Sequence, residues 1–166
     1  DILAAAPMEM ITAGLGDILG KYTRLLDWKM AHIITGEYYC SHIADMVKEA
    51  VEIVVEESTR IKDRNPDAVK AVTEALVLSG IAMSFVGNSR PASGSEHHLS
   101  HYWEMKFQAE GKKPILHGIK VGIGMIAVTK MYETLENEQF DFASLKERSF
   151  DYAAWKKKVK YCYQDA

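Results

Sequence analysis

Hydrophobic residues recur every three or four positions along almost the whole chain, which is the period of an amphipathic α-helix. The first such segment follows Pro7 and runs to about Ile34, where Thr35-Gly36 ends it. Three glycines interrupt this segment, and each costs roughly 1 kcal/mol in a helix interior relative to Ala. They therefore predict either close backbone packing or a break near Asp17 that divides the segment into two helices.

The same period continues downstream, and no segment has the strict alternation expected of a strand. The chain is therefore predicted to be all-α, a bundle of five to seven helices. Asn88-Ser89-Arg90-Pro91 is expected to be non-helical because the residue before a proline avoids helical angles. The further helices are expected at Tyr38 to about Ile61, from the loop at 62–67 to near Gly87, around His97–Trp103 with Ser93 or Ser95 as cap, from His117 to about Glu136, near Phe140–Leu145, and over Tyr152–Tyr163.

Composition narrows the class of protein. The 166 residues suffice for one domain, and 48% hydrophobic with 26% charged residues is typical of a globular protein. A net charge of −3 argues against a nucleic-acid or anionic-membrane surface, and no signal peptide or membrane-length apolar run is found. Cys40 and Cys162 follow no zinc or redox spacing, which favours a reduced, cytoplasmic location. Because the chain begins at Asp1 inside a structured segment, we expect a fragment of a longer protein.

Four of the six histidines lie close together in the sequence, at positions 97, 98, 101 and 117. A spacing of four residues places His97 and His101 on one helix face, whereas His98 points about 100° away. His117 begins the next predicted helix, across the turn at 111–114. Two imidazoles from adjacent helices can therefore meet at one ion, and the pattern predicts a metal site.

A catalytic metal site usually has a third protein ligand, and Asp17 is the best candidate upstream. Its apolar, glycine-rich surroundings make burial of the carboxylate costly without a cation. One carboxylate and two imidazoles suit Zn²⁺, Fe²⁺ or Ni²⁺. Other interpretations stay open: Asp17 could cap a helix, His98 could be a surface residue, and Asp27 and Glu104 could be ordinary helix salt-bridge partners.

Several long motifs, in the same order, carry a resemblance to a known family. The chain resembles the bacterial sn-glycerol-1-phosphate dehydrogenases, within the iron-containing alcohol dehydrogenase and dehydroquinate synthase superfamily. The resemblance extends from Asp1 to about Glu136 and is loose after Asn137. The matching strings are GLGDILGKYT at 14–23, DWKMAH at 27–32, TGEYYC at 35–40, SGIAMSFVGNSRPASGSEHHLSH at 79–101 and LHGIKVGIG at 116–124.

The resemblance assigns roles residue by residue. In this family an aspartate and two histidines of a helical C-terminal domain hold the metal, which matches Asp17, His97 and His117. His101 then lines the site as the catalytic proton relay. His98 is a rival for the first histidine position because some relatives space this pair differently.

The resemblance also implies a reaction and a cofactor. The family reduces dihydroxyacetone phosphate to sn-glycerol 1-phosphate with NAD(P)H, bound by an N-terminal Rossmann-like domain. This sequence lacks the glycine-rich phosphate loop of that domain, so the Rossmann-like domain is expected to be absent and this piece inactive alone. Arg90, with Asn88 and Ser89, is the expected phosphate site. A homodimer is expected from the family.

Two other functions stay open. One is a glycerol dehydrogenase or a dehydroquinate-synthase-like relative, in which a non-phosphorylated substrate would leave Arg90 without a role. The other is a helical metal-binding module that does not catalyse a reaction.

Overall fold

The computed structural model describes residues 2–139 and 150–163, and these residues form helices and connecting turns without a strand. The predicted all-α fold is therefore confirmed. The predicted short helix near Phe140–Leu145 lies outside the described residues. The helices are α1 (Met8–Leu19), α2 (Lys21–Thr35), α3 (Ser41–Glu57), the 3₁₀ helix η1 (Ser58–Asp63), α4 (Pro66–Val86), α5 (Ser95–Ala109), α6 (His117–Asn137) and α7 (Tyr152–Tyr163).

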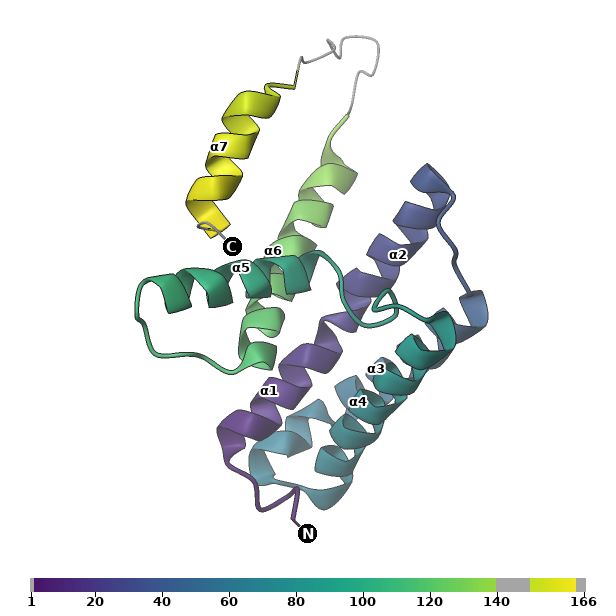
Figure 1. Ribbon diagram of the computed structural model, residues 1–166. Coiled ribbons are helices and arrows are strands. Elements are labelled where there is room, and N and C mark those ends of the chain that lie inside the picture. The colour runs from purple at the N-terminus through teal and green to yellow at the C-terminus, as the bar shows by residue number, and fades with distance from the viewer. Residues whose placement is uncertain (1, 140–149, 164–166) are drawn as a thin grey trace.

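The first predicted segment is a pair of helices, α1 and α2, which follow each other as a long rod (Figure 1). They are divided at Gly20, three residues beyond the predicted position of the break. Glycine also ends two helices where a left-handed backbone is required, since Gly36 after α2 has φ +73° and Gly87 after α4 has φ +76°. Both helix ends agree with the predicted ones.

Helices α3 and α4 form a hairpin against α1 (Figure 1). The second predicted helix begins at Ser41, three residues later than expected, and its last turn tightens into η1. Asn65 caps α4, because its side-chain oxygen accepts hydrogen bonds from the backbone N–H groups of Asp67 and Ala68. The main hydrophobic core lies between α1, α3, η1 and α4, and its buried side chains include Ile11, Ile18, Val47, Val51, Val54, Ile61, Val69 and Val72.

Helix α5 crosses in front of α6 (Figure 1), and its start differs from the prediction. The predicted cap by Ser93 or Ser95 is wrong. The cap residue is Gly94, which has no side chain that could bond to the helix. A carboxylate from another helix takes this role instead, because Asp27 Oδ2 of α2 accepts a hydrogen bond of 2.7 Å from the Ser95 N–H. A partner distant in sequence therefore fixes the start of the histidine helix.

Helices α1 and α6 approach so closely that only glycine fits at their crossing. A Cβ atom added at Gly118 would lie 1.8 Å from the Ala13 carbonyl oxygen, and one at Gly16 would lie 2.3 Å from the Gly118 carbonyl oxygen. The glycines that the sequence analysis treated as costly therefore permit close backbone packing. This contact places Asp17 of α1 beside the first turn of α6.

Helix α4 corrects the expectation about membrane-length segments. Among the described residues it is the one helix that is long and apolar enough to cross a membrane, with a mean hydropathy of 1.6. Lys70 and Glu74 interrupt its apolar run in the sequence. Its alanine-rich face packs against α1 and α3, and 28% of the apolar window is buried.

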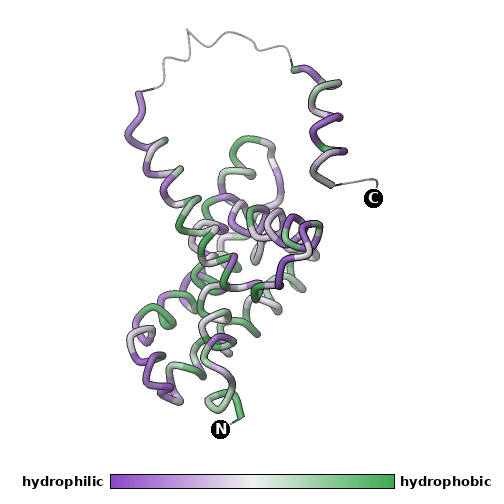
Figure 2. The backbone as a smooth tube through the Cα atoms, turned by 90° about the vertical axis from the view of Figure 1, so that its left-hand side faces the viewer, coloured by the Kyte–Doolittle hydropathy of each residue, from purple (hydrophilic) through white to green (hydrophobic). Residues whose placement is uncertain are grey.

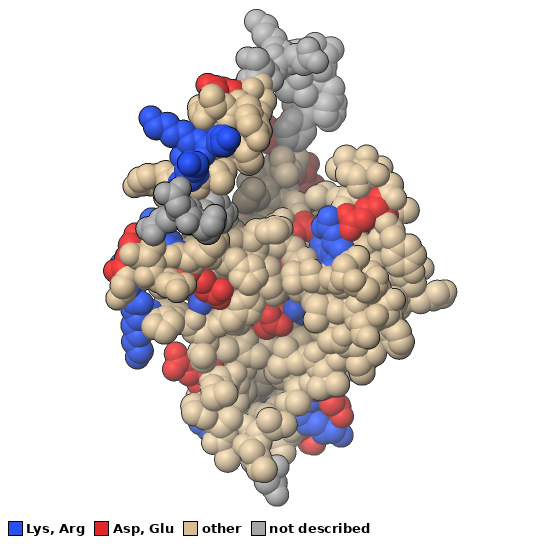
Figure 3. Space-filling view, viewed as in Figure 1, with Lys and Arg blue, Asp and Glu red and all other residues tan. Residues whose placement is uncertain are grey.

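The outer surface mixes polar and apolar residues. Hydrophobic and hydrophilic positions alternate along most helices (Figure 2), as expected of amphipathic segments. On the face seen in Figure 3, charges are scattered, apart from a group of lysines over α7. The exposed Lys156, Lys157 and Lys158 belong to that helix, so the lysine run is a solvated helix face.

Candidate metal centre

Three side chains from three helices meet where α1, α5 and α6 come together. Asp17 Oδ1 lies 3.3 Å from His97 Nε2 and 3.9 Å from His117 Nε2. The ligand atoms of all three groups lie within 4.8 Å of one another. Asp17 lies inside α1 and does not cap it. His97 is buried, Asp17 is partly buried, and 41% of the His117 side chain is exposed, so one side of the group faces solvent.

These separations fit a single divalent ion. Oxygen and nitrogen ligands lie about 2.0–2.2 Å from zinc, and a tetrahedral arrangement therefore places them about 3.4 Å from each other. The two Asp17–histidine distances lie near that value. One carboxylate oxygen and two imidazole nitrogens are also the donor types of catalytic zinc and iron sites, which leave a position open for water or substrate.

Asp17 and His97 are held by further hydrogen bonds. Lys21 Nζ donates to Asp17 Oδ2 at 2.9 Å and to the Ala92 carbonyl oxygen, which leaves Asp17 Oδ1 facing the histidines. His97 Nδ1 lies 2.8 Å from Glu96 Oε1, and Glu96 is fully buried. Metal-binding histidines usually bond to such a carboxylate through their second nitrogen.

The electrostatics favour an ionised Asp17. Burial raises the pKa of Asp17, but hydrogen bonds from His97 and Lys21 and the charge of Lys21 outweigh burial and lower it to about 2. Burial lowers the pKa of His97. Its hydrogen bonds to Asp17 and Glu96 raise the pKa, and together they outweigh burial, so the net shift is upward. The pocket therefore favours positive charge next to the Asp17 carboxylate.

His101 lies beside this group but on its exposed side. Its ring centre is 5.3 Å from that of His117 and 6.2 Å from that of His97, and 56% of its side chain is exposed. Both His101 and His117 contact Glu104. Burial raises the pKa of Glu104, but hydrogen bonds from His117, His101 and Lys120 lower it to about 2. A second group of metal-ligand type consists of His101, Glu104 and His117.

The predicted phosphate residues lie beside the histidines. Asn88, Ser89 and Arg90 line one open cleft of about 640 Å³ together with His97, His98 and His101. The guanidinium of Arg90 is engaged, since its Nε and Nη2 donate to the two carboxylate oxygens of Glu37. Asn88 Oδ1 accepts a hydrogen bond from the Arg90 backbone N–H. A phosphate entering this cleft therefore has to compete with Glu37 for Arg90.

For two other candidates, the structure agrees with the sequence interpretation of His98 as a surface residue and differs from that of Asp27. His98 is exposed and lies outside both groups of metal-ligand residues, so the structure brings His97 to Asp17. Within the described ranges, Asp27 forms no helix salt bridge; it accepts hydrogen bonds from the Ser95 N–H and from the Tyr132 hydroxyl. Burial, followed by this hydrogen bond to Asp27, raises the pKa of Tyr132.

Four further side chains support this centre. Lys21, Lys120 and Glu96 were not predicted from the sequence, and Glu104 was considered only as an ordinary helix salt-bridge partner. Helical spacing could have found three of them, because a residue three or four positions from a ligand lies on the same face. Lys21 is four positions after Asp17, Glu104 three after His101, and Lys120 three after His117. The fourth, Glu96, directly precedes His97, and its contact depends on the local turn.

A buried cation lies beneath the start of α5. Arg24 is fully buried, and its three side-chain nitrogens have no hydrogen-bond partner among the described residues. Burial, followed by the charge of Arg90, lowers the pKa of Arg24 to about 10, while Asp27, Glu96 and Glu37 raise it. The guanidinium therefore serves as a counter-charge for the carboxylates of Asp27 and Glu96 at the start of α5.

Comparison with known proteins gives relatives that all carry the same name. The chain is 44% identical to glycerol-1-phosphate dehydrogenase (NAD(P)+) of Halalkalibacterium halodurans over 80% of its length. It is 36% identical to the enzyme of the same name from Geobacillus stearothermophilus over 94% of its length, and 42% identical to that from Staphylothermus marinus over 80%. No family model matches the chain. The chain spans 33–39% of the length of these relatives.

The relatives first define the class of protein. The all-α chain matches dehydrogenases that are named as NAD(P)+-dependent. Within that class, the chain belongs to the glycerol-1-phosphate dehydrogenase family and matches about a third of the length of its members. The resemblance inferred from the sequence motifs is therefore confirmed.

Proposed function

We propose that this chain is the helical metal- and substrate-binding domain of an NAD(P)-dependent sn-glycerol-1-phosphate dehydrogenase that reduces dihydroxyacetone phosphate. The convergence of Asp17, His97 and His117 supports the proposal most strongly, because their separations suit one divalent ion. Zn²⁺, Fe²⁺ and Ni²⁺ all accept this donor set. The named relatives support the dehydrogenase part of the proposal.

The chemistry of the centre follows from its donors. Asp17, His97 and His117 would hold a divalent ion, which would supply Lewis-acid chemistry at the substrate carbonyl. His101, on the open side of the group, is placed to donate the proton that completes the alcohol. A nicotinamide cofactor, bound mainly by residues outside this chain, would supply the hydride.

Arg90 is proposed to select a phosphorylated substrate. A guanidinium binds two phosphate oxygens through its parallel N–H groups, the arrangement that it now uses with Glu37. Because Arg90 lines the same cleft as His97 and His101, one triose phosphate can contact both ends of the cleft. Asn88 and Ser89 complete the proposed phosphate-binding turn.

Metal analysis of the isolated chain tests the central claim. Wild type is expected to bind one zinc ion, whereas Asp17→Asn, His97→Ala and His117→Ala each lose binding because they remove a ligand. His98→Ala is the matched control for His97→Ala, since His98 is the adjacent but exposed histidine. Equal zinc binding by wild type and the three ligand variants would refute the site.

Activity of a longer protein that contains this chain tests the substrate. Dihydroxyacetone phosphate is expected to be reduced faster than dihydroxyacetone, and Arg90→Met is expected to abolish this preference while activity with dihydroxyacetone is retained. An unchanged preference in the Arg90 variant would favour a relative that acts on a non-phosphorylated substrate. In that case the Arg90–Glu37 ion pair is purely structural. Zinc binding without any turnover would instead favour the non-catalytic module.

A further inference from the structure

Glu104 is surrounded by nitrogen atoms from two helices. One carboxylate oxygen, Oε1, lies 2.8 Å from His117 Nδ1 and 3.2 Å from Lys120 Nζ, both on α6. The other oxygen, Oε2, lies 3.2 Å from Nδ1 of His101, one turn earlier on α5. Both oxygens of one carboxylate are therefore engaged, and the carboxylate links two imidazoles from different helices.

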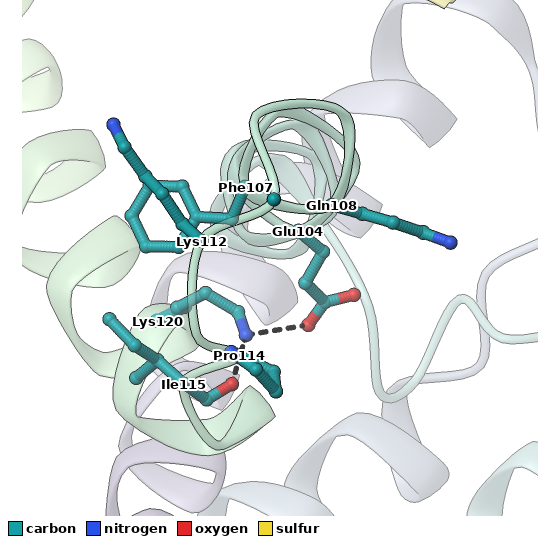
Figure 4. Close-up of a pocket in the computed structure, with 8 residues that line it drawn as sticks. Glu104, Phe107, Gln108, Lys112, Pro114, Ile115 and Lys120 are labelled. Carbon is teal, nitrogen blue, oxygen red and sulfur yellow. Dashed lines mark hydrogen bonds and ion pairs between the residues drawn. The ribbon is translucent and has the colours of Figure 1, made fainter.

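Lys120 holds this carboxylate in place. Its side chain is 6% exposed, and its ammonium group donates to the Ile115 carbonyl oxygen as well as contacting Glu104 (Figure 4). Glu104 and Lys120 form part of the wall of a cleft of about 460 Å³ between α5 and the segment before α6 (Figure 4). A buried ammonium group with two fixed acceptors leaves the Glu104 carboxylate little freedom to turn.

The contacts of Glu104 determine which nitrogen of each ring carries the proton. A neutral imidazole has one N–H group and one lone pair, and an ionised carboxylate only accepts hydrogen bonds. His117 and His101 must therefore donate from Nδ1, which leaves the lone pair of each ring on Nε2. In His117 this Nε2 is the atom that faces Asp17 Oδ1 at 3.9 Å.

We infer that Glu104, anchored by Lys120, is a positioning residue that sets the tautomer and ring orientation of both His117 and His101. The inference rests on the proposed function for its effect on metal binding, whereas its effect on the tautomers is independent of a metal. A single carboxylate then aligns the proposed metal ligand and the proposed proton relay together. His101 donates a proton from Nε2 only in its imidazolium form, in which Nδ1–H stays bonded to Glu104. Outer hydrogen-bond partners of metal-binding histidines typically change metal affinity by about 10–100-fold.

Glu104, His101 and His117 could in principle hold a second ion of their own. The Lys120 ammonium group lies 3.2 Å from the same carboxylate and would repel a divalent cation there. The Nδ1 atoms of both rings also face carboxylate oxygens and are bonded already. The geometry therefore favours a positioning role, and binding of two zinc ions per chain, with loss of one in Glu104→Met, would overturn it.

The test uses the 166-residue chain and two readouts. Nitrogen-15 NMR of the histidine rings in the metal-free protein reports which ring nitrogen is protonated, and competition with a chelator reports the zinc Kd. Glu104→Met removes both acceptor oxygens at similar volume, and Glu104→Gln keeps one of them. Glu110→Met is the matched control, because Glu110 lies at the end of the same helix and pairs with Lys112 at 2.6 Å, away from the histidines.

Glu104→Met is expected to give mixed tautomers at His117 and His101 and to weaken zinc binding about 10–100-fold. Glu104→Gln should have tautomer populations and a zinc Kd between those of wild type and Glu104→Met. Glu110→Met should match wild type in both readouts. Wild-type tautomers together with a zinc Kd within twofold of wild type in Glu104→Met would overturn the inference. If Glu104→Met does not fold, as judged by circular dichroism, Glu104→Ala replaces it with the same criteria.

The two proposals can fail separately. If Asp17→Asn binds zinc as well as wild type, the metal site is wrong, and the tautomer readout alone still decides the role of Glu104. If Asp17→Asn loses zinc while Glu104→Met keeps both the tautomers and the affinity, the metal site stands and the positioning role is wrong.

Discussion

The crossing of α1 and α6 gives the sharpest test of how the fold builds the site, through the substitution Gly118→Ala. The new Cβ would lie 1.8 Å from the Ala13 carbonyl oxygen and 2.6 Å from the carbonyl carbon. Carbon–oxygen contacts in helix interfaces are about 3.3–3.6 Å, so the overlap is about 1.5 Å. Both groups belong to backbone, and the helices therefore have to separate or bend.

Gly118→Ala is expected to reduce both the folding stability and the zinc affinity of the chain. Overpacking of a tight interface destabilises a protein by about 1–3 kcal/mol, and an overlap with backbone belongs at the upper end, near 3 kcal/mol. Metal binding should suffer as well, because Asp17 lies one turn after Ala13 and His117 directly precedes Gly118. Metal–ligand distances tolerate only about ±0.2 Å, whereas this crossing would open by about 1 Å. Zinc affinity is therefore expected to fall at least tenfold.

Urea unfolding measures the folding stability, and chelator competition measures the zinc affinity. Gly80→Ala is the matched control, because Gly80 lies inside α4 and a Cβ there would meet no atom within 4 Å. That variant should gain up to about 1 kcal/mol from helix propensity and keep its zinc Kd. If Gly118→Ala unfolds at the same urea concentration as wild type and binds zinc equally well, the close crossing does not determine the site.

Two further predictions concern carboxylates. In the metal-free chain the pKa of Asp17 is lowered from 3.8 to about 2, so its stabilising effect is present above pH 4 and is lost as the pH falls toward 2. The difference in unfolding free energy between wild type and Asp17→Asn should therefore shrink by roughly 2 kcal/mol over that interval in urea titrations, and a constant difference would refute it. Asp27→Ala should cost about 1–3 kcal/mol in thermal unfolding, because it removes the hydrogen bond to the Ser95 N–H and the contact with Tyr132. Ser93→Ala is its control and should stay within about 0.5 kcal/mol of wild type.

Much of the fold could be predicted because helix signals are local. Pro66 after a polar loop, and Gly36 and Gly87 at helix ends, mark boundaries through the backbone angles they allow. The start of α5 could not be found in this way, since its capping carboxylate, Asp27, is 68 positions away in the sequence. A serine near a helix start is a good local prediction that a distant partner overrode.

The candidate site likewise has features that local spacing predicts and features that depend on contacts between distant residues. The i, i+4 spacing placed His97 and His101 on one face, and residue type and position singled out Asp17 and His117. The motif resemblance then assigned the ligand roles to Asp17, His97 and His117. Period and spacing alone could not bring α1 to α6, because that approach depends on which glycine backbones meet. The same limit concealed the Arg90–Glu37 ion pair, which joins residues 53 positions apart.

The distribution of the ligands leads to a last prediction about the chain by itself. Asp17, His97 and His117 lie on α1, α5 and α6, and the hydrogen-bond partners that orient them, Lys21, Glu96 and Glu104, lie on α2 and α5. The geometry of the proposed ligands is therefore set within the helical bundle. We expect the isolated chain and a longer protein that contains the nucleotide-binding part to bind zinc with Kd values within about tenfold of each other. Chelator competition on both proteins measures this ratio, and an isolated chain that folds but does not bind zinc would show that the centre is completed elsewhere.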